Sequence, residues 1–239
     1  MPHPAVLLLA RADHGPVATP FVTGALEAHD PFRPSRHTAF IADDGIAAGI
    51  VRALGSVSVS VAQYPFTEML VVHQGVVTLS SAGRSIDLEP GQSAVIGRGT
   101  ALRIDVQGAG MWAFCAATRA SGPDEPGLTL IDRDATLAPS AAPEPGILIG
   151  PTPHCRSSNL FEDTASALRI GVWDSTPYQR LARPHKVHEL MHLIEGEVEL
   201  HPEGGPSVHV KPGDTVFVPQ GTPCAWTSTV HVRKFYAVT

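Results

Sequence analysis

Much of this sequence is present in two copies. The segment YPFTEMLVVHQGVVTL aligns with HKVHELMHLIEGEVEL at an offset of 121 residues, which matches Glu68 with Glu189 and Gly75 with Gly196. The match continues at an offset of 122 between LEPGQSAVIGRGTALRI and VKPGDTVFVPQGTPCAW, and returns to 121 between FCAAT and FYAVT. A repeat of this kind predicts two tandem copies of one structural unit.

The repeat also sets the predicted domain boundaries. The two copies span residues 36–118 and 157–239, with an N-terminal extension at 1–35 and a connection at 119–156. The connection contains SGPDEPG, APSAAPEPG and GPTPHC, and such Pro- and Gly-rich stretches are typical of a loose linker. Within it, LTLI (Leu128 to Ile131) is predicted to add an edge strand to a sheet.

Each copy has the pattern of short β-strands. SVSVSVAQY alternates small polar with β-branched residues, while EMLVVHQGVVTL and ELMHLIEGEVEL each resemble two strands joined by a glycine turn. Turn signals recur about every 8–12 residues, without a convincing long helical pattern. The sequence therefore predicts an all-β protein whose two units are small barrels or sandwiches.

The pentapeptide HELMH has the H-E-x-x-H pattern, which on a helix holds zinc in metallopeptidases. The alternation that follows, from Val198 to Leu200, is the period of a strand instead. On a strand, His188 and His192 would be roughly 13 Å apart, because each residue advances about 3.3 Å. They could not share one ion, so we expect both histidines on the outer face of a sheet.

Composition narrows the class of protein. Hydrophobic residues make up 43% of the chain without a long apolar run, and the apolar stretch from Val6 to Ala10 is too short for a signal core. Cys115, Cys155 and Cys224 are odd in number and scattered, which fits a reducing compartment, so the predicted localisation is cytoplasmic. The formal charge of −6 without a basic block argues against nucleic acid and membrane partners and favours a small molecule.

Two motifs of the second copy resemble those of the cupin superfamily. They are His185-x3-Glu189-x6-Gly196 and Gly213-x5-Pro219-x-Gly221-x2-Cys224. With both copies included, the chain resembles a bicupin. Its local sequence is similar to a branch of cupins that was once called a domain of unknown function and is now grouped with (S)-ureidoglycine aminohydrolase. The resemblance implies two tandem cupin barrels of the jelly-roll, or double-stranded β-helix, type.

The ligand positions of that resemblance are only partly filled. Arg183 stands at the first histidine position, Cys224 at the third, and Ser228 replaces the closing asparagine. The resemblance implies one divalent ion (Zn, Mn, Fe or Ni) in the second barrel, held by His185 and Glu189 with Cys224 as a substitute ligand. The alternatives are a turn role for His185, a buried thiol at Cys224, and an ion pair of Glu189 with Arg183 in place of a metal.

The first copy has still fewer ligands. Its corresponding positions are Ala62, Tyr64, Glu68 and Leu102, which leave one carboxylate and no imidazole. We expect no metal there, and an interior that is either filled by side chains or adapted to an apolar ligand.

Two functions follow from these residues. The first is a divalent-metal-dependent enzyme acting on a small ureido or amino acid derivative, as the resemblance implies. The second is a non-catalytic binding or sensory module in which Arg183 holds an anionic ligand. Trp226, Tyr236 and Tyr178 are the further substrate-binding candidates, with packing as the alternative for each. A homodimer is expected under either function, because open sheet edges favour pairing.

Overall fold

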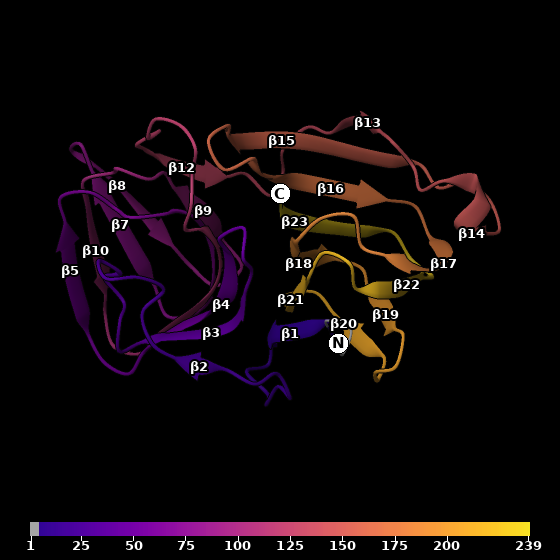
Figure 1. Ribbon diagram of the computed structural model, residues 1–239, viewed down its shortest axis with the longest axis horizontal. Helices are drawn as coiled ribbons and strands as arrows, with labels where there is room; N and C mark the ends of the chain where they lie inside the picture. Colours follow the sequence, from indigo (N-terminus) through magenta and orange to yellow (C-terminus); the bar gives the residue numbers. More distant parts are fainter. Residues whose placement is uncertain (1–4) are drawn as a thin grey trace. The chain divides into compact units, whose positions relative to one another are not determined.

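A computed structural model describes residues 5–239 of the chain (Figure 1). The all-β prediction is confirmed, since the described residues form strands and one short 3-10 turn, η1 (Pro145–Ile147). The chain divides into two compact units. The first unit comprises Ala18–Asp132 and Phe161–Leu168, and the second comprises the residues up to Val17, Arg133–Leu160 and Arg169–Thr239. No helix in the described range is long and apolar enough to cross a membrane.

The first unit consists of two antiparallel sheets. The larger has the strand order β12-β9-β6-β11-β4-β3-β2, and the smaller has the order β5-β10-β7-β8. The strands are β2 (Val22–Thr23), β3 (Arg36–Ile41), β4 (Ile46–Ala53), β5 (Val57–Val61), β6 (Thr67–Gln74), β7 (Val77–Ser81), β8 (Arg84–Leu88), β9 (Ser93–Ile96), β10 (Leu102–Val106), β11 (Gly110–Ala117) and β12 (Leu128–Ile131).

The second unit repeats this arrangement. Its larger sheet has the order β1-β21-β18-β23-β16-β15-β13, and its smaller sheet has the order β14-β17-β22-β19-β20. The strands are β1 (Leu7–Ala10), β13 (Ala138–Ser140), β14 (Leu148–Ile149), β15 (Cys155–Asp163), β16 (Leu168–Ser175), β17 (Tyr178–Pro184), β18 (Glu189–Glu195), β19 (Val198–Pro202), β20 (Val208–Val210), β21 (Thr215–Val218), β22 (Pro223–Ser228) and β23 (Val232–Val238).

Both units are two-sheet jelly rolls with matching strand orders. The predicted barrels are therefore open, because none of the sheets formed by the described strands closes on itself. The predicted edge strand at Leu128–Ile131 is confirmed, since β12 pairs with β9 at the edge of the larger sheet. The N-terminal β1 holds the corresponding edge position in the second unit, where it pairs with β21. Both segments outside the repeats thus complete a sheet.

One of the glycines that the two copies share is required by sterics. Gly75 and Gly196 follow β6 and β18, with φ values of 74° and 73° that residues with a side chain rarely adopt. A Cβ atom at Gly196 would lie 1.9 Å from the carbonyl oxygen of His231, and one at Gly75 would lie 2.6 Å from that of Ala109. Each glycine therefore permits a tight turn against a neighbouring loop.

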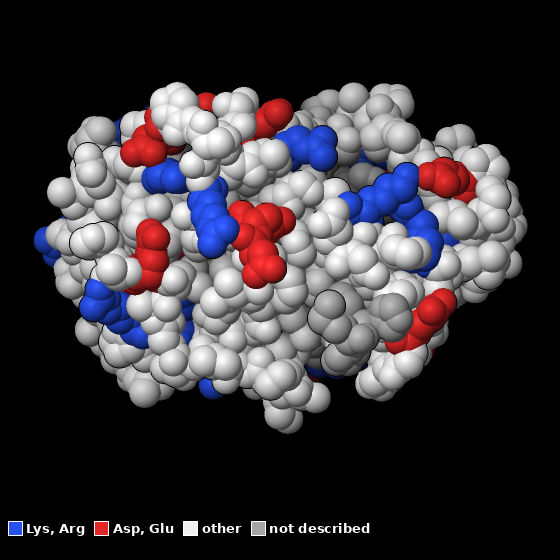
Figure 2. Space-filling model, viewed as in Figure 1, with Lys and Arg blue, Asp and Glu red and all other residues white. Residues whose placement is uncertain are grey.

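Each unit has a core of its own. In the first, residues such as Trp112, Phe114 and Leu70 are buried between the sheets, and in the second Met191 and Leu193 contribute. On the face shown in Figure 2, the described Lys and Arg side chains lie in separate groups among acidic and neutral residues.

Candidate functional site

The second unit contains a cavity of about 460 Å³, a size typical of small-molecule sites. All seven residues singled out from the sequence line it: Tyr178, Arg183, His185, Glu189, Cys224, Trp226 and Tyr236. They come from β17, β18, β22 and β23 and from the turn after β17. The structure thus brings these residues together, while the role of each remains a prediction.

Glu189 lies at the centre of the polar contacts in this cavity. One carboxylate oxygen, Oε2, is 2.8 Å from Nε2 of His185, and the other, Oε1, accepts a hydrogen bond of 2.8 Å from Nζ of Lys234. The side chains are nearly enclosed, with exposed fractions of 13% for Glu189, 12% for His185 and 7% for Lys234. Both oxygens of the carboxylate are therefore engaged by neighbouring side chains.

These contacts decide the charge state of Glu189. Burial alone would raise the pKa of its carboxyl group, because a charge in a dry environment is unfavourable. The positive charge of Lys234 and the hydrogen bond with His185 act more strongly together, and they hold the pKa well below its ordinary value. Glu189 is consequently ionised at neutral pH.

Aromatic rings surround the ammonium group of Lys234. Its Nζ lies 4.8 Å from the ring centre of Trp173 and 5.4 Å from that of Trp226, which are cation–π distances. Trp173 and Lys234 are direct partners between β16 and β23. Tyr178 stacks on Trp226 with ring centres 5.5 Å apart. One wall of the cavity is therefore aromatic.

Two arginines of β17, which pairs with β22, also line the cavity. Nη1 of Arg180 donates to the carbonyl oxygen of Cys224 over 2.7 Å. Arg183 faces Cys224 in the strand register, and its Nε is buried without a hydrogen-bond partner among the described residues. The predicted ion pair between Arg183 and Glu189 is wrong, because Lys234 and His185 occupy both oxygens of that carboxylate.

The predicted metal ligands do not form a metal centre. His185 and Glu189 bind each other, and the Lys234 ammonium contacts the carboxylate where a cation would bind. Sγ of Cys224 donates to the carbonyl oxygen of Ala225 over 3.2 Å, and burial, partly offset by Arg180, raises the pKa of this thiol. Within residues 5–239 no three His, Cys, Asp or Glu side chains are grouped to hold an ion. This donor set does not fit a divalent metal.

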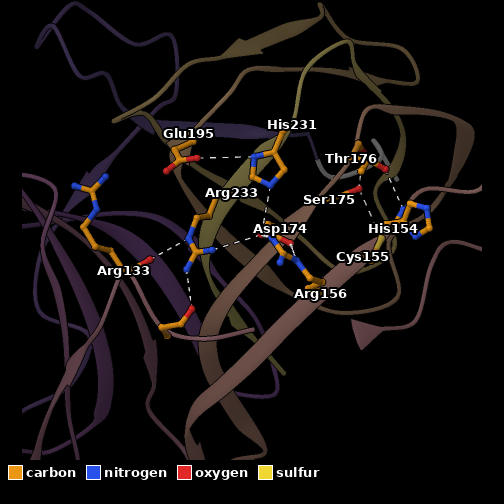
Figure 3. Close-up of polar contacts among 11 residues, drawn as sticks. Arg133, His154, Cys155, Arg156, Asp174, Ser175, Thr176, Glu195, His231 and Arg233 are labelled. Atoms are coloured by element: carbon orange, nitrogen blue, oxygen red, sulfur yellow. Dashed lines mark hydrogen bonds and ion pairs between the residues drawn. The ribbon is translucent and has the colours of Figure 1, made fainter. Parts of the chain in front are cut away.

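A second polar cluster fixes the strands behind the aromatic wall. Figure 3 shows Asp174 of β16 at its centre, with Arg156, His231 and Arg233 directed toward its carboxylate. Arg156 binds this carboxylate through two guanidinium nitrogens. Nη1 of Arg233 lies 3.4 Å and Nε2 of His231 lies 3.3 Å from its Oδ2 atom. Successive strand residues point to opposite faces, so this cluster lies behind Trp173 and ties β15, β16 and β23 together.

Buried side chains surround Glu68, the glutamate of the first unit. Arg36 is fully buried and pairs with Asp30 over 2.7 Å and with Glu68 over 3.0 Å. The hydroxyl of Tyr64 donates to Glu68 over 3.0 Å. Three phenylalanine rings surround the guanidinium group, the nearest being Phe114 at 4.3 Å. These contacts favour an interior filled by side chains, which stays a prediction for the unit as a whole.

Four of the five residues of HELMH lie on a strand, as predicted, since β18 begins at Glu189. His188 and His192 alternate with the cavity-lining residues of β18 and therefore face away from the cavity. Both are buried. Nδ1 of His188 accepts a hydrogen bond from the backbone of Gln220, and Nδ1 of His192 contacts the hydroxyl of Thr215. These contacts are of the kind that buried polar groups make in packed sheets.

Some residues of the cavity were not predicted from the sequence. They are Arg180 and the segment Ser140–Pro143. Lys234 and Trp173 could be named from the sequence as residues that line a pocket or pack, and both line the cavity, but the hydrogen bond from Lys234 to Glu189 was not predicted. Ser140–Pro143 belongs to the connection between the copies, and no repeat pattern pointed to it.

Comparisons with known proteins agree with this fold. The family model described as EutQ-like cupin domain matches residues 163–236. A crystal structure from Pseudomonas syringae pv. tomato str. DC3000, of a protein of unknown function in the DUF861 family, is 63% identical. It covers 99% of this chain and 100% of that one, with a TM-score of 0.95.

More distant structures share the fold alone. A cupin 2 conserved barrel domain protein from Leptotrichia buccalis is 9% identical, covers 85% of this chain and 88% of its own, and has a TM-score of 0.57. A salicylate 1,2-dioxygenase from Pseudaminobacter salicylatoxidans is 11% identical, covers 82% and 71%, and has a TM-score of 0.52. No curated protein matches the chain.

Proposed function

We propose, from the premise that this chain belongs to the DUF861 family of the cupin superfamily, that its second unit binds a small organic carboxylate without a metal ion. The observation that carries this proposal is the charge balance of the cavity. Arg169, Arg180, Arg183 and Lys234 line it together with a single carboxylate, Glu189. Since Lys234 already pairs with Glu189, the guanidinium groups give the cavity an excess of positive charge.

The shape and lining of the cavity define the rest of the ligand. The aromatic wall of Trp173, Trp226 and Tyr178 offers flat apolar surface, which favours a planar or apolar body. A guanidinium fork matches the geometry of a carboxylate and discriminates it from a neutral amide. We therefore expect a monocarboxylic acid small enough for about 460 Å³.

Calorimetric titration of the whole chain tests this function. The probes are propionate, hexanoate and benzoate, each compared with its neutral amide. Carboxylates are expected to bind at least about tenfold more tightly than their amides, because one charged hydrogen bond contributes about 1.5–3 kcal/mol. Arg183→Gln should remove this preference, whereas Arg84→Gln, at an exposed position of the first unit, should keep it. Equal affinities for acids and amides would refute the function.

A second candidate function is catalysis on a small ureido or amino acid derivative. The observation that favours it is the hydrogen bond between His185 and Glu189 inside the cavity. An imidazole oriented by a carboxylate is a common arrangement for proton transfer. Ammonia release from ureido acids by wild type, absent in His185→Ala, would support this candidate, and binding without turnover would support the first. Under both candidate functions, we propose that the whole chain is a bicupin whose first unit is filled by side chains.

A further inference from the structure

The segment Ser140–Ile149, here called the strap, forms part of the cavity. It lies outside both repeats, and its residues Ser140, Ala141, Ala142 and Pro143 contribute to the cavity lining. Each end of the strap is fastened by strand pairing. At its start Ser140 pairs with Cys155 of β15, and at its end Leu148 and Ile149 of β14 pair with β17.

Two buried donors along this cavity have no partner. The hydroxyl oxygen of Ser140, on the strap, and Nε of Arg183, on β17, are both enclosed without a hydrogen-bond partner among the described residues. Both residues line the same cavity. A buried donor without an acceptor costs about 1–3 kcal/mol, and more when the group is charged. A ligand acceptor between the two donors would remove this cost.

We propose that Ser140 and Arg183 together bind the carboxylate of the ligand, so that the strap supplies a specificity-determining residue. This inference rests on the proposed function and adds to it the subsite and the class of ligand. Arg183 provides a charged N–H and Ser140 a neutral O–H, which together suit an oxyanion with two accepting oxygens. The neighbouring Ala141, Ala142 and Pro143 have no side-chain donors, so the remainder of the ligand there is apolar.

The contacts in the middle of the strap are weak. Glu144 and Lys186 form an ion pair of 2.6 Å, but their side chains are 64% and 65% exposed, so solvent screens the pair. The strap residues from Glu144 to Gly146 are exposed as well. A ligand bonded to Ser140 would hold the strap in place.

Titration calorimetry with benzoate tests the subsite. Ser140→Ala is expected to weaken benzoate binding about tenfold, as the loss of one hydrogen bond to a charged group predicts. The matched control Ser85→Ala, at an exposed position of the first unit, should bind benzoate like wild type. If wild type and Arg183→Gln differ while Ser140→Ala binds like wild type, the subsite is refuted and the proposed function stands. If wild type prefers no carboxylate over its amide, both fail.

Hydrogen exchange on the wild-type chain gives an independent test that needs no variant. Saturating benzoate should slow amide exchange in residues 141–147 relative to the free protein, because the bound carboxylate restrains the strap. Residues 84–88 of the first unit serve as the internal control and should exchange at the same rate in both states. Unchanged exchange in the strap at saturation would overturn the proposal, even if Ser140→Ala failed to fold.

Discussion

Lys234 donates a hydrogen bond of 2.8 Å to the buried carboxylate of Glu189 and thereby neutralises it. The first unit also pairs the matching glutamate, Glu68, with a cation, since Nη2 of Arg36 lies 3.0 Å from its carboxylate. The two cations come from different strands, β23 and β3. Each copy has thus kept the glutamate of the repeat and paired it with a basic side chain.

Removing Lys234 should destabilise the second unit. Lys234→Met leaves the Glu189 charge buried without its ammonium partner, which typically costs about 3–5 kcal/mol. Urea denaturation monitored by tryptophan fluorescence would measure this loss. The double variant Lys234→Met/Glu189→Gln removes both charges and should recover much of the stability. A double variant less stable than Lys234→Met would contradict the pairing.

The stability of the chain should depend on the ionisation of Glu189. Its folded pKa lies below the ordinary value of 4.5, because the Lys234 charge and the His185 bond outweigh burial. The unfolded chain therefore binds this proton more readily, so the stabilisation is present above the ordinary pKa and is lost as the pH falls. Urea midpoints of wild type should exceed those of Glu189→Gln near neutral pH, and the difference should shrink in acid. A constant difference would show that Glu189 titrates alike in both states.

Arg36 is expected to be structural. Arg36→Met leaves Asp30 and Glu68 buried without their cation and should cost about 3–5 kcal/mol of stability. Arg103→Met is the matched control, because Arg103 forms an exposed pair with Asp105, and its urea midpoint should match that of wild type. Carboxylate binding by the remaining folded Arg36→Met chain should be unchanged. Loss of binding in fully folded protein would contradict a role confined to the first unit.

Metal binding should appear only when the blocking cation is removed. The double variant Arg183→His/Lys234→Ala frees Glu189 from its ammonium and adds an imidazole at the first histidine position of the cupin motif. Calorimetric titration with Zn²⁺ should detect tighter binding in this variant than in Arg183→His alone, where Lys234 still holds the carboxylate. Equal Zn²⁺ affinity in the two variants would indicate that Lys234 does not block the site.

The fold was predictable because its signals are local. Alternation in segments such as SVSVSVAQY and the glycine turns at Gly75 and Gly196 fix strands and turns within a few residues, and the repeat doubles each observation. The path of β1 was not predictable, because pairing between Leu7–Ala10 and β21 joins residues far apart in the sequence. The predicted domain boundaries, the homodimer and the small-molecule partner remain predictions.

The sequence predicts which residues line the cavity, but it does not predict which cation pairs with Glu189. The cupin motif located His185, Glu189 and Cys224, and the aromatic candidates Tyr178, Trp226 and Tyr236 also line the cavity. Which cation reaches Glu189 depends on the length and direction of side chains in three dimensions, and Lys234 lies on a strand 45 residues further along. Sequence spacing favoured Arg183, which is closer in the chain, yet the ion pairs of Glu189 among the described residues are with His185 and Lys234.

The most direct test of metal-free carboxylate binding is a benzoate titration of the wild-type chain, purified without added metal, in the presence and absence of EDTA, with elemental analysis of the same sample. Metal-free binding predicts a metal content far below one per chain and the same benzoate affinity in both titrations. About one equivalent of bound metal per chain, together with loss of benzoate binding when EDTA removes it, would show that the ligand needs the metal.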